Sequence, residues 1–333
     1  MSPNSPSQST TAYLQHLQEF AERLRGDANR LDHDADCAKV WFDRLQEEGL
    51  NIGASQHLPL SGTEFCEALA IFARVSGTFG FLFLQQLVAN PHLNAPLTPS
   101  WERVGIAFGH LRRTEGVCPV WHDGYVNGFV PWMSGARIFD RVVLGMRDKD
   151  GLELLALVPA QDRQEFSHTS PLPLFACSGT DTVSVHIHNL HISAEEILTV
   201  RPKGAQAEGD AKGLLFHTPL LIGCIEALWS LIAPLSHLDT AIKQQTEEAT
   251  KRLLTRLRTA FEQGNTLEGN RLRAEVGDFA VRLARLAMMA IGGNALLLSH
   301  PAQRLYREAM LYNLMAQTDV IVQDAFQSVL AHL

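Results

Sequence analysis

The stretch IGGNALLLSHPAQRLYREA, residues 291–309, interrupts a long helical region with a Gly-Gly-Asn turn and restarts it at His-Pro. Gly292 or Gly293 can adopt the left-handed conformation that ends a helix, which a residue with a Cβ resists. Pro301 suits the first turn of the next helix, where its missing N–H costs nothing. The stretch therefore predicts two helices joined by a rigid turn. Its backbone N–H groups could face a polar ligand, although a plain helix–helix connector is the simpler interpretation.

The composition limits the classes of partner. The chain has 333 residues, of which 46% are hydrophobic and 19% charged, as in an ordinary globular protein. The formal net charge of −8 and the lack of a basic stripe argue against a nucleic-acid partner. The most apolar run, residues 214–235, contains Pro219 and Glu226, so we expect a buried helix there and no membrane span.

Cysteines and histidines give no metal signature. The five cysteines are scattered, and none forms a Cys-x-x-Cys pair, so neither a disulfide framework nor a zinc site is expected. This cysteine usage is simplest to explain by a reducing, cytoplasmic location. His186 and His188 share one face of a predicted strand, but no carboxylate or cysteine is placed with them. We expect this face to be exposed to solvent.

The hydrophobic pattern divides the chain into three blocks after a tail. Residues 1–9 are polar and rich in Ser and Pro, which is typical of a disordered tail. Residues 10–100 have the apolar spacing of an N-terminal helical domain. Residues 101–205 alternate with a period of two between turns, which predicts a central antiparallel β domain. Residues 206–333 return to long amphipathic helices, so the expected class is a multi-domain α+β fold that ends in a four-helix bundle.

Two segments resemble the acyl-CoA dehydrogenase superfamily. In residues 291–309, a Gly-Gly turn is followed by Pro and then by a pattern similar to the family's Leu-x-Arg-Asp-Ala. VNGFVPWMSGARIFDRVVLGMR, residues 126–147, is similar to part of the family's middle β domain. The matched residues are Gly292, Gly293, Asn294, Pro301, Leu305, Arg307 and Ala309 in the first segment, and Asn127, Gly128, Trp132 and Ser134 in the second. The order of the segments fits the family, so the resemblance extends over roughly the whole chain.

The resemblance implies a flavin-dependent oxidoreductase with FAD between the β domain and the C-terminal bundle. The residues that it assigns to the flavin are Trp132, Ser134, Gly292, Gly293 and Thr318. The family's Glu, which removes the α proton of an acyl thioester, corresponds to Ala316, and a methyl group cannot accept a proton. Some relatives carry the base before the first C-terminal helix, in the region of Glu208 and Asp210. Here that region, residues 203–213, is expected to be a flexible polar loop, so no catalytic residue is assigned.

Three departures from the family concern the cofactor. Met289 replaces a Gln ahead of the Gly-Gly turn, and FGHLRRTEG, residues 108–116, replaces the Thr-Glu-Pro-Gly-x-Gly-Ser-Asp turn. The Arg-Lys-x-Phe-Gly segment that holds the FAD diphosphate across a subunit contact has no counterpart. Without these donors the diphosphate loses charge-assisted hydrogen bonds. FAD is therefore the expected cofactor by resemblance, and FMN, reduced flavin supplied in trans and no flavin at all stay open.

Three functions follow from this pattern. The first is an acyl-CoA dehydrogenase-like oxidoreductase that acts on an acyl thioester or a related small organic substrate. The second is a monooxygenase of the same superfamily, which receives reduced flavin from a partner flavin reductase and needs no catalytic Glu. The third is a non-catalytic scaffold or binding protein that has lost flavin. As in the family, a homo-oligomer (a dimer or a tetramer) is expected, with a small molecule such as acyl-CoA as ligand.

Overall fold

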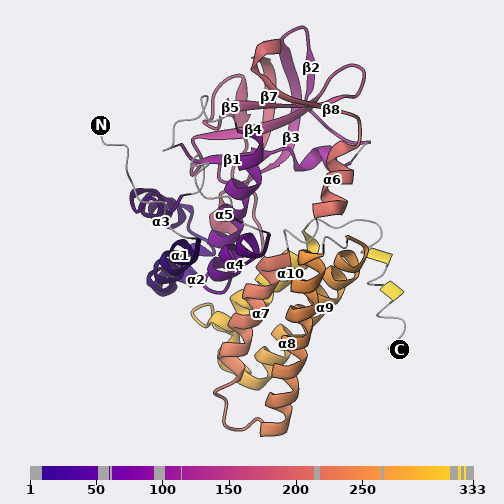
Figure 1. Cartoon of the computed structure of the whole chain (residues 1–333). Helices are drawn as coiled ribbons and strands as arrows, with labels where there is room; N and C mark the ends of the chain where they lie inside the picture. Colours follow the sequence, from indigo (N-terminus) through magenta and orange to yellow (C-terminus); the bar gives the residue numbers. More distant parts are fainter. Residues whose placement is uncertain are drawn as a thin grey trace.

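The computed structural model describes residues 10–51, 60, 62–93, 102–113, 115–213, 218–263, 266–315, 322–323 and 326–327. Helices come first, a β-sheet follows and long helices come last, which confirms the expected α+β fold class. The sheet lies at one end of the molecule and the long C-terminal helices at the other, and the N-terminal helices pack beside the junction (Figure 1).

The N-terminal helices have local signals that explain where they begin. They are α1 (Thr10–Leu24), α2 (Ala28–Leu31), α3 (Ala35–Glu47), α4 (Gly62–Ala73) and α5 (Gly77–Ala89). Asp34 caps α3 with its carboxylate, as Asp favours at this position. Ser76 caps α5 by accepting a hydrogen bond from Phe79 N. The apolar stretch therefore breaks into two helices just before Gly77.

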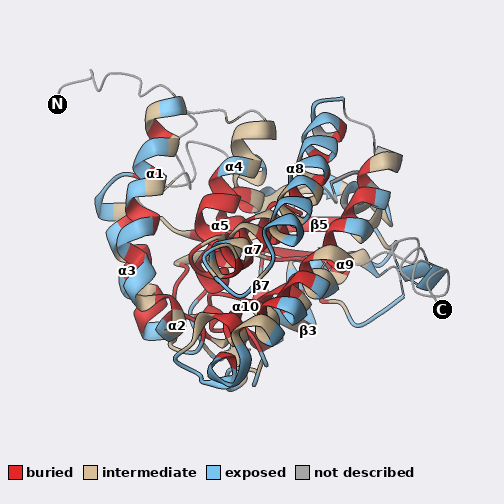
Figure 2. Ribbon diagram, turned by 90° about the horizontal axis from the view of Figure 1, so that it is seen from below, coloured by how far each residue is buried: buried red, intermediate tan, exposed pale blue. Residues whose placement is uncertain are grey.

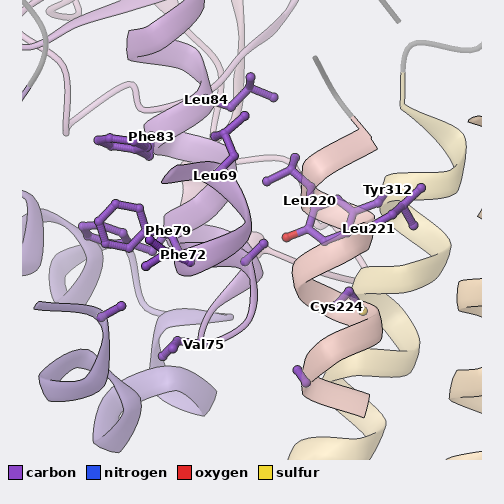
Figure 3. Close-up of a cluster of buried hydrophobic side chains, with 14 of the residues drawn as sticks. Leu69, Phe72, Val75, Phe79, Phe83, Leu84, Leu220, Leu221, Cys224 and Tyr312 are labelled. Atoms are coloured by element: carbon purple, nitrogen blue, oxygen red, sulfur yellow. The ribbon is translucent and has the colours of Figure 1, made fainter. Parts of the chain in front are cut away.

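The C-terminal helices α7 (Thr218–Ile232), α8 (Thr240–Glu262), α9 (Thr266–Ile291) and α10 (Pro301–Leu314) form the expected bundle (Figure 1). Buried residues gather where α5, α7 and α10 meet (Figure 2). There, Phe72 and Phe79 share one apolar core with Leu220, Leu221 and Tyr312 (Figure 3). The apolar helix α7 is largely buried, as its sequence predicts. This shared core holds α10 against the N-terminal helices.

One described helical segment, Arg271–Leu296, is long and apolar enough to cross a bilayer by length and composition alone. This is weak evidence for a membrane span, because the core helices of globular proteins pass the same test. The segment ends in the turn that the sequence predicts. Gly292 has a φ of +75° and closes α9. Pro301 then begins α10, behind the N-cap residue His300.

The sheet contains eight strands and is mixed. They are β1 (Val104–Ala107), β2 (Val120–His122), β3 (Tyr125–Met133), β4 (Arg141–Arg147), β5 (Glu153–Pro159), β6 (Phe166–His168), β7 (Val183–His191) and β8 (Ile197–Arg201). The strand order is β6-β7-β3-β2-β4-β5-β8, with β1 beside β4. Most pairs are antiparallel, as expected. However, β1 and β2, which are separated by η3 (Gly109–Arg112), both run parallel to β4.

The interpretation of residues 203–213 as a flexible loop was wrong, because Ala205–Gly213 form the helix α6. The cause is the buried carboxylate of Glu153 on β5. It accepts hydrogen bonds from Gly204 N at 3.0 Å and from Gln206 N at 2.9 Å, at the end where a helix leaves its N–H groups unpaired. This partner lies far away in the sequence, so the local composition gave no sign of the helix.

Candidate functional site

Trp132 and Ser134 lie together at the end of β3, and they differ in exposure. The Trp132 side chain is 59% exposed, whereas Met133 between them is fully buried and Ser134 is 8% exposed. Trp132 lies on β3, whereas Ser134 directly follows the strand and turns its hydroxyl to Thr182. A large indole this open, beside a nearly buried hydroxyl, gives a flat surface on which a planar ligand can stack.

A chain of hydroxyl groups leads inward from Ser134. Ser134 Oγ lies 2.7 Å from Thr182 Oγ1, which lies 2.9 Å from Thr180 Oγ1. Thr180 Oγ1 in turn donates to the carbonyl oxygen of Cys177 at 2.7 Å. All three hydroxyl contacts are buried. The polar atoms beside Trp132 are therefore ordered by the protein itself.

The turn before β7 has an unusual backbone. Its 3-10 segment, Ser178–Thr180, is flanked by Cys177 and Asp181, both left-handed, with φ of 54° and 48°. Gly179 packs so tightly that a Cβ there would overlap the carbonyl oxygen of Leu31. Non-glycine residues in this conformation cost energy that surrounding contacts must supply. The tertiary contacts of this turn supply it.

Asp32 and Arg307 hold the turn from two other parts of the chain. Asp32 Oδ1 accepts a hydrogen bond from Cys177 N at 2.8 Å, and its Oδ2 pairs with Arg307 Nη2 at 2.6 Å. Arg307 Nη1 also donates to the carbonyl oxygen of Phe175 at 2.8 Å. The position of the hydroxyl chain thus depends on a residue after α2 and on a residue in α10.

A second buried pair lies beside this contact. Arg304 Nη1 donates to Glu308 Oε1 at 2.7 Å, and Gly77 N donates to the same oxygen at 3.0 Å. Arg304 is 4% exposed and Glu308 is fully buried. Burial raises the pKa of the Glu308 carboxyl, and the Arg304 guanidinium opposes that rise. The pair fixes α10 to the start of α5.

Asp32, Cys177 and Glu308 also bring three potential metal ligands within 4.8 Å of one another. Burial raises the pKa of the Cys177 thiol well above its ordinary value, which disfavours the thiolate that a metal requires. Both carboxylates already pair with arginines, so a divalent cation would have to displace a guanidinium. We therefore interpret this cluster as structural.

The Gly-Gly turn lies on the surface. Gly292 and Gly293 are exposed, and a Cβ on either would meet no atom within 4 Å. The segment Gly292–Leu296 contacts α9 and α10. The structure therefore joins two of the site residues suggested by the sequence but leaves the turn open on the surface.

The other candidate positions are placed only in part. Ala316 and Thr318 lie outside the described residues. Glu208 is exposed on α6. The segment that replaces the family's long turn is closed onto the sheet, where His110 Nε2 lies 3.0 Å from the carbonyl oxygen of Gly145. Arg147 Nη2 also donates to the carbonyl oxygen of Leu111 at 3.2 Å.

Thr180 and Thr182 were missed by the sequence interpretation. They belong to the run SGTDT, residues 178–182, directly before a predicted strand. A cluster of small hydroxyl residues at that place is a turn signal. Nothing local indicates that the run would meet Ser134, since the two segments meet only in the folded chain, through the pairing of β3 with β7 and the hydrogen bond from Gly135 N to Thr180 O.

Comparison with known proteins identifies the fold. No protein-family model matches the chain, and no curated protein matches it either. Solved structures do match. Butyryl-CoA dehydrogenase from Megasphaera elsdenii has 14% identity and a TM-score of 0.77, over 99% of this chain and 100% of that one. A nitrososynthase from Micromonospora carbonacea var. africana has 16% identity and a TM-score of 0.78, over 99% and 98%.

A third solved structure comes from the same group of folds. Dibenzothiophene monooxygenase from Paenibacillus sp. A11-2 has 16% identity and a TM-score of 0.74, over 96% of this chain and 97% of that one. At such identities the likeness shows that the chains are folded alike. The reaction has to be argued from the site residues, because proteins of one fold can catalyse different reactions. The chain has an acyl-CoA dehydrogenase-like fold over nearly its whole length, and its arrangement is similar to that of a butyryl-CoA dehydrogenase, a monooxygenase and a nitrososynthase.

Proposed function

We propose that this protein is a flavin-dependent oxidoreductase whose flavin ring packs on Trp132 beside Ser134. The observation that carries the proposal is the open indole of Trp132 next to an ordered, buried chain of hydroxyl groups. Ligand sites combine an apolar surface with a few fixed polar groups, and a flavin ring needs both. Bound there, a flavin would supply the electron transfer, and the protein would supply the stacking surface and the hydrogen bonds.

The residues fit the ring of a flavin better than a diphosphate. Trp132 and Ser134 supply contacts for the ring. The segment at residues 108–113 instead packs onto the sheet through His110 and Arg147. This arrangement supports FMN, or FAD that is held mainly by its ring. One of the similar solved structures is described as FMN-bound.

For the reaction, we propose oxidation of a small organic substrate, with an acyl thioester as the first class to test. A dehydrogenase of this kind needs a base, and Ala316 stands where the resemblance would place it. This substitution favours a second candidate, a monooxygenase that uses reduced flavin delivered by a reductase. The likeness to dibenzothiophene monooxygenase and to a nitrososynthase supports the same candidate.

We further propose that a second copy of the chain completes the site. Large apolar side chains are exposed near the Gly-Gly turn: Leu286, Met289, Leu296, Leu297 and Leu298. Apolar patches of this kind on a protein surface usually mark an interaction site. Gly292 and Gly293 are exposed in the same region, and a Cβ on either would meet no atom within 4 Å. A partner copy would cover the leucines and bring this turn to the flavin, and Thr318 would join it if the resemblance holds there.

The test is flavin retention by purified protein. The protein is incubated with FAD or FMN, oxidised or reduced, free flavin is removed, and the bound flavin is measured by visible absorbance after reoxidation. We expect the wild type to retain flavin in at least one state, and Trp132→Ala to lose most of it. Val200→Ala removes an exposed apolar side chain from β8 and serves as the control. If no flavin is retained in either state, the proposal is wrong.

A further inference from the structure

A cavity of about 160 Å³ lies between α4, α7 and α8, the helices below the sheet in Figure 1. Neither Trp132 nor Ser134 lines it, so it is a different place from the surface proposed for the flavin. An apolar cavity of about 150 Å³ in a protein can admit benzene. The space between the three helices therefore suits a ligand that buries a few carbon atoms.

The close packing of α4 on α7 explains where the cavity begins. Gly223 of α7 approaches α4 so closely that a Cβ there would lie 2.5 Å from the carbonyl oxygen of Ala70. Ile222, the neighbour of this glycine, and Ala70 itself both line the cavity. On the third side, α8 contributes Leu254 and Leu257. Leu257 also belongs to the main apolar core, which holds α8 in this position.

The buried and half-buried part of the lining is mostly apolar. Ala70 and Leu257 are buried, and Ile222 and Leu254 are half-buried. Cys66 adds a thiol, and burial raises its pKa to about 12. The thiol is therefore protonated at neutral pH and acts as a small apolar group. An aliphatic group bound against these side chains would be removed from water, which favours binding.

Four charged side chains also line the cavity, and two of them neutralise each other. Arg74 Nη2 lies 2.6 Å from Glu226 Oε2, and Arg74 Nε donates to the same oxygen at 2.7 Å. Glu67 and Arg258 are exposed. Within the described part of the chain, neither forms a hydrogen bond or an ion pair, with each other or with another residue. The cavity thus presents one carboxylate and one guanidinium without partners, beside an aliphatic wall.

We propose that this cavity binds an α-amino acid with an aliphatic side chain, such as leucine. The ligand carboxylate pairs with Arg258, whose planar guanidinium can donate two parallel hydrogen bonds to it. The ligand ammonium group pairs with Glu67, and the side chain lies against Ile222 and Leu254. A simple carboxylate would leave Glu67 without a partner and bring two negative charges together. A simple amine would do the same with Arg258 and two positive charges.

The experiment is isothermal titration calorimetry of the full chain with three probes that share one carbon skeleton. Leucine carries both charges, isocaproate lacks the ammonium group, and isoamylamine lacks the carboxylate. Each missing charge removes one partly exposed ion pair, which corresponds to about fivefold in affinity. We therefore expect leucine to bind about fivefold more tightly than either analogue.

Two variants assign each charge of the ligand to its partner. Arg258→Gln should weaken the binding of leucine and isocaproate about fivefold and should not weaken that of isoamylamine. Glu67→Gln should weaken leucine and isoamylamine and should not weaken isocaproate. Both residues are exposed, so the variants should fold. Arg252→Gln is the matched control, because Arg252 is exposed on the same helix and does not line the cavity. Leu254→Phe fills the cavity and should abolish binding of all three probes.

The inference is overturned if leucine does not bind, or if it binds equally well to wild type, Arg258→Gln and Glu67→Gln. It is also overturned if isocaproate or isoamylamine binds to wild type as tightly as leucine, because the cavity would then recognise only one charge. Equal leucine affinity of wild type and folded Leu254→Phe would place the site elsewhere and overturn it as well. None of these results depends on flavin, so the inference and the proposed function can fail independently.

Discussion

The carboxylate of Glu308 accepts a hydrogen bond from the backbone N–H of Gly77 at 3.0 Å, across 231 positions of the chain. The contact requires the absence of a side chain at residue 77, because a Cβ there would lie 2.5 Å from Glu308 Cδ and closer still to the Tyr312 hydroxyl. This glycine therefore allows α5 and α10 to meet. Three predictions concern the contacts around this junction and the sheet, and a fourth concerns the exposed turn.

Gly77→Ala should lower the free energy of unfolding by about 1–3 kcal/mol, the usual cost of overpacking a core. The added methyl group has to push aside two fully buried side chains, Glu308 and Tyr312. Gly209→Ala in α6 is the control, because a Cβ there meets no atom within 4 Å and alanine favours a helix. Urea unfolding of the three proteins measures the effect. Equal stability of Gly77→Ala and wild type would contradict the packing described here.

Glu308→Gln should lower the free energy of unfolding by about 3–5 kcal/mol, because it removes the carboxylate that pairs with the buried charge of Arg304. The change keeps the shape of the side chain, so packing is little altered. Asp278→Asn breaks the exposed ion pair with Arg282 at the same spacing and should cost less than about 1 kcal/mol. Similar losses of stability in the two variants would show that the buried Arg304–Glu308 pair stabilises the protein no more than the exposed Asp278–Arg282 pair does.

His110 should make the protein less stable in mild acid. Burial lowers the pKa of its imidazole to about 4, and the neutral ring pairs with the carbonyl oxygen of Gly145. Because this pKa is depressed, the unfolded chain binds the proton first as the pH falls. The contribution of neutral His110 to the free energy of unfolding is therefore complete above about pH 6.5. It is lost as the pH falls from about 6.5 to about 4, and the loss amounts to at most about 3 kcal/mol.

The check is urea unfolding of wild type and His110→Gln at several pH values from 7 to 4. The variant should lose less stability over this range than the wild type, because glutamine does not titrate. His188→Gln, an exposed change on β7, should follow the wild type. If the free energy of unfolding falls with pH equally steeply in wild type and in His110→Gln, the buried neutral imidazole is not the cause of the acid sensitivity.

Leu298→Glu should disrupt the proposed assembly. Leu298 is 81% exposed beside the Gly-Gly turn, and a charge in a covered apolar contact is costly. Sedimentation should find the wild type as a dimer or larger and the variant as a smaller species with weaker flavin retention. Val200→Glu places the same charge on an exposed residue of β8 and should leave both properties unchanged. A monomeric wild type that retains flavin would argue against a shared site.

The sequence predicted those features that depend on near neighbours. Gly292 and Pro301 mark their turn through their own backbone preferences, and both take the predicted positions. The order of helices, sheet and helices follows from periodicity and is confirmed. The closeness of Trp132 and Ser134 follows from their positions two residues apart at the end of the strand.

Features that depend on distant partners were not predictable. Helix α6 exists because Glu153, about fifty residues earlier, accepts hydrogen bonds from its first N–H groups. The position of the hydroxyl chain depends on the left-handed backbone of Cys177 and on Asp32. Residue types alone do not carry such information, because each of these contacts joins segments that meet only in the folded chain.

The pairing of Asp32 with Arg307 has a consequence for how the site is made. The Asp32 carboxylate reaches Cys177 across 145 positions, and Arg307 reaches Phe175 across 132. Such contacts between remote parts of a chain form late in folding, because the intervening loops must close first. The surface beside Trp132 is thus completed only when the first helices and the last helix have both arrived. During synthesis on the ribosome, Ser134 emerges long before Arg307, the residue of α10 that pairs with Asp32 and holds the turn before β7.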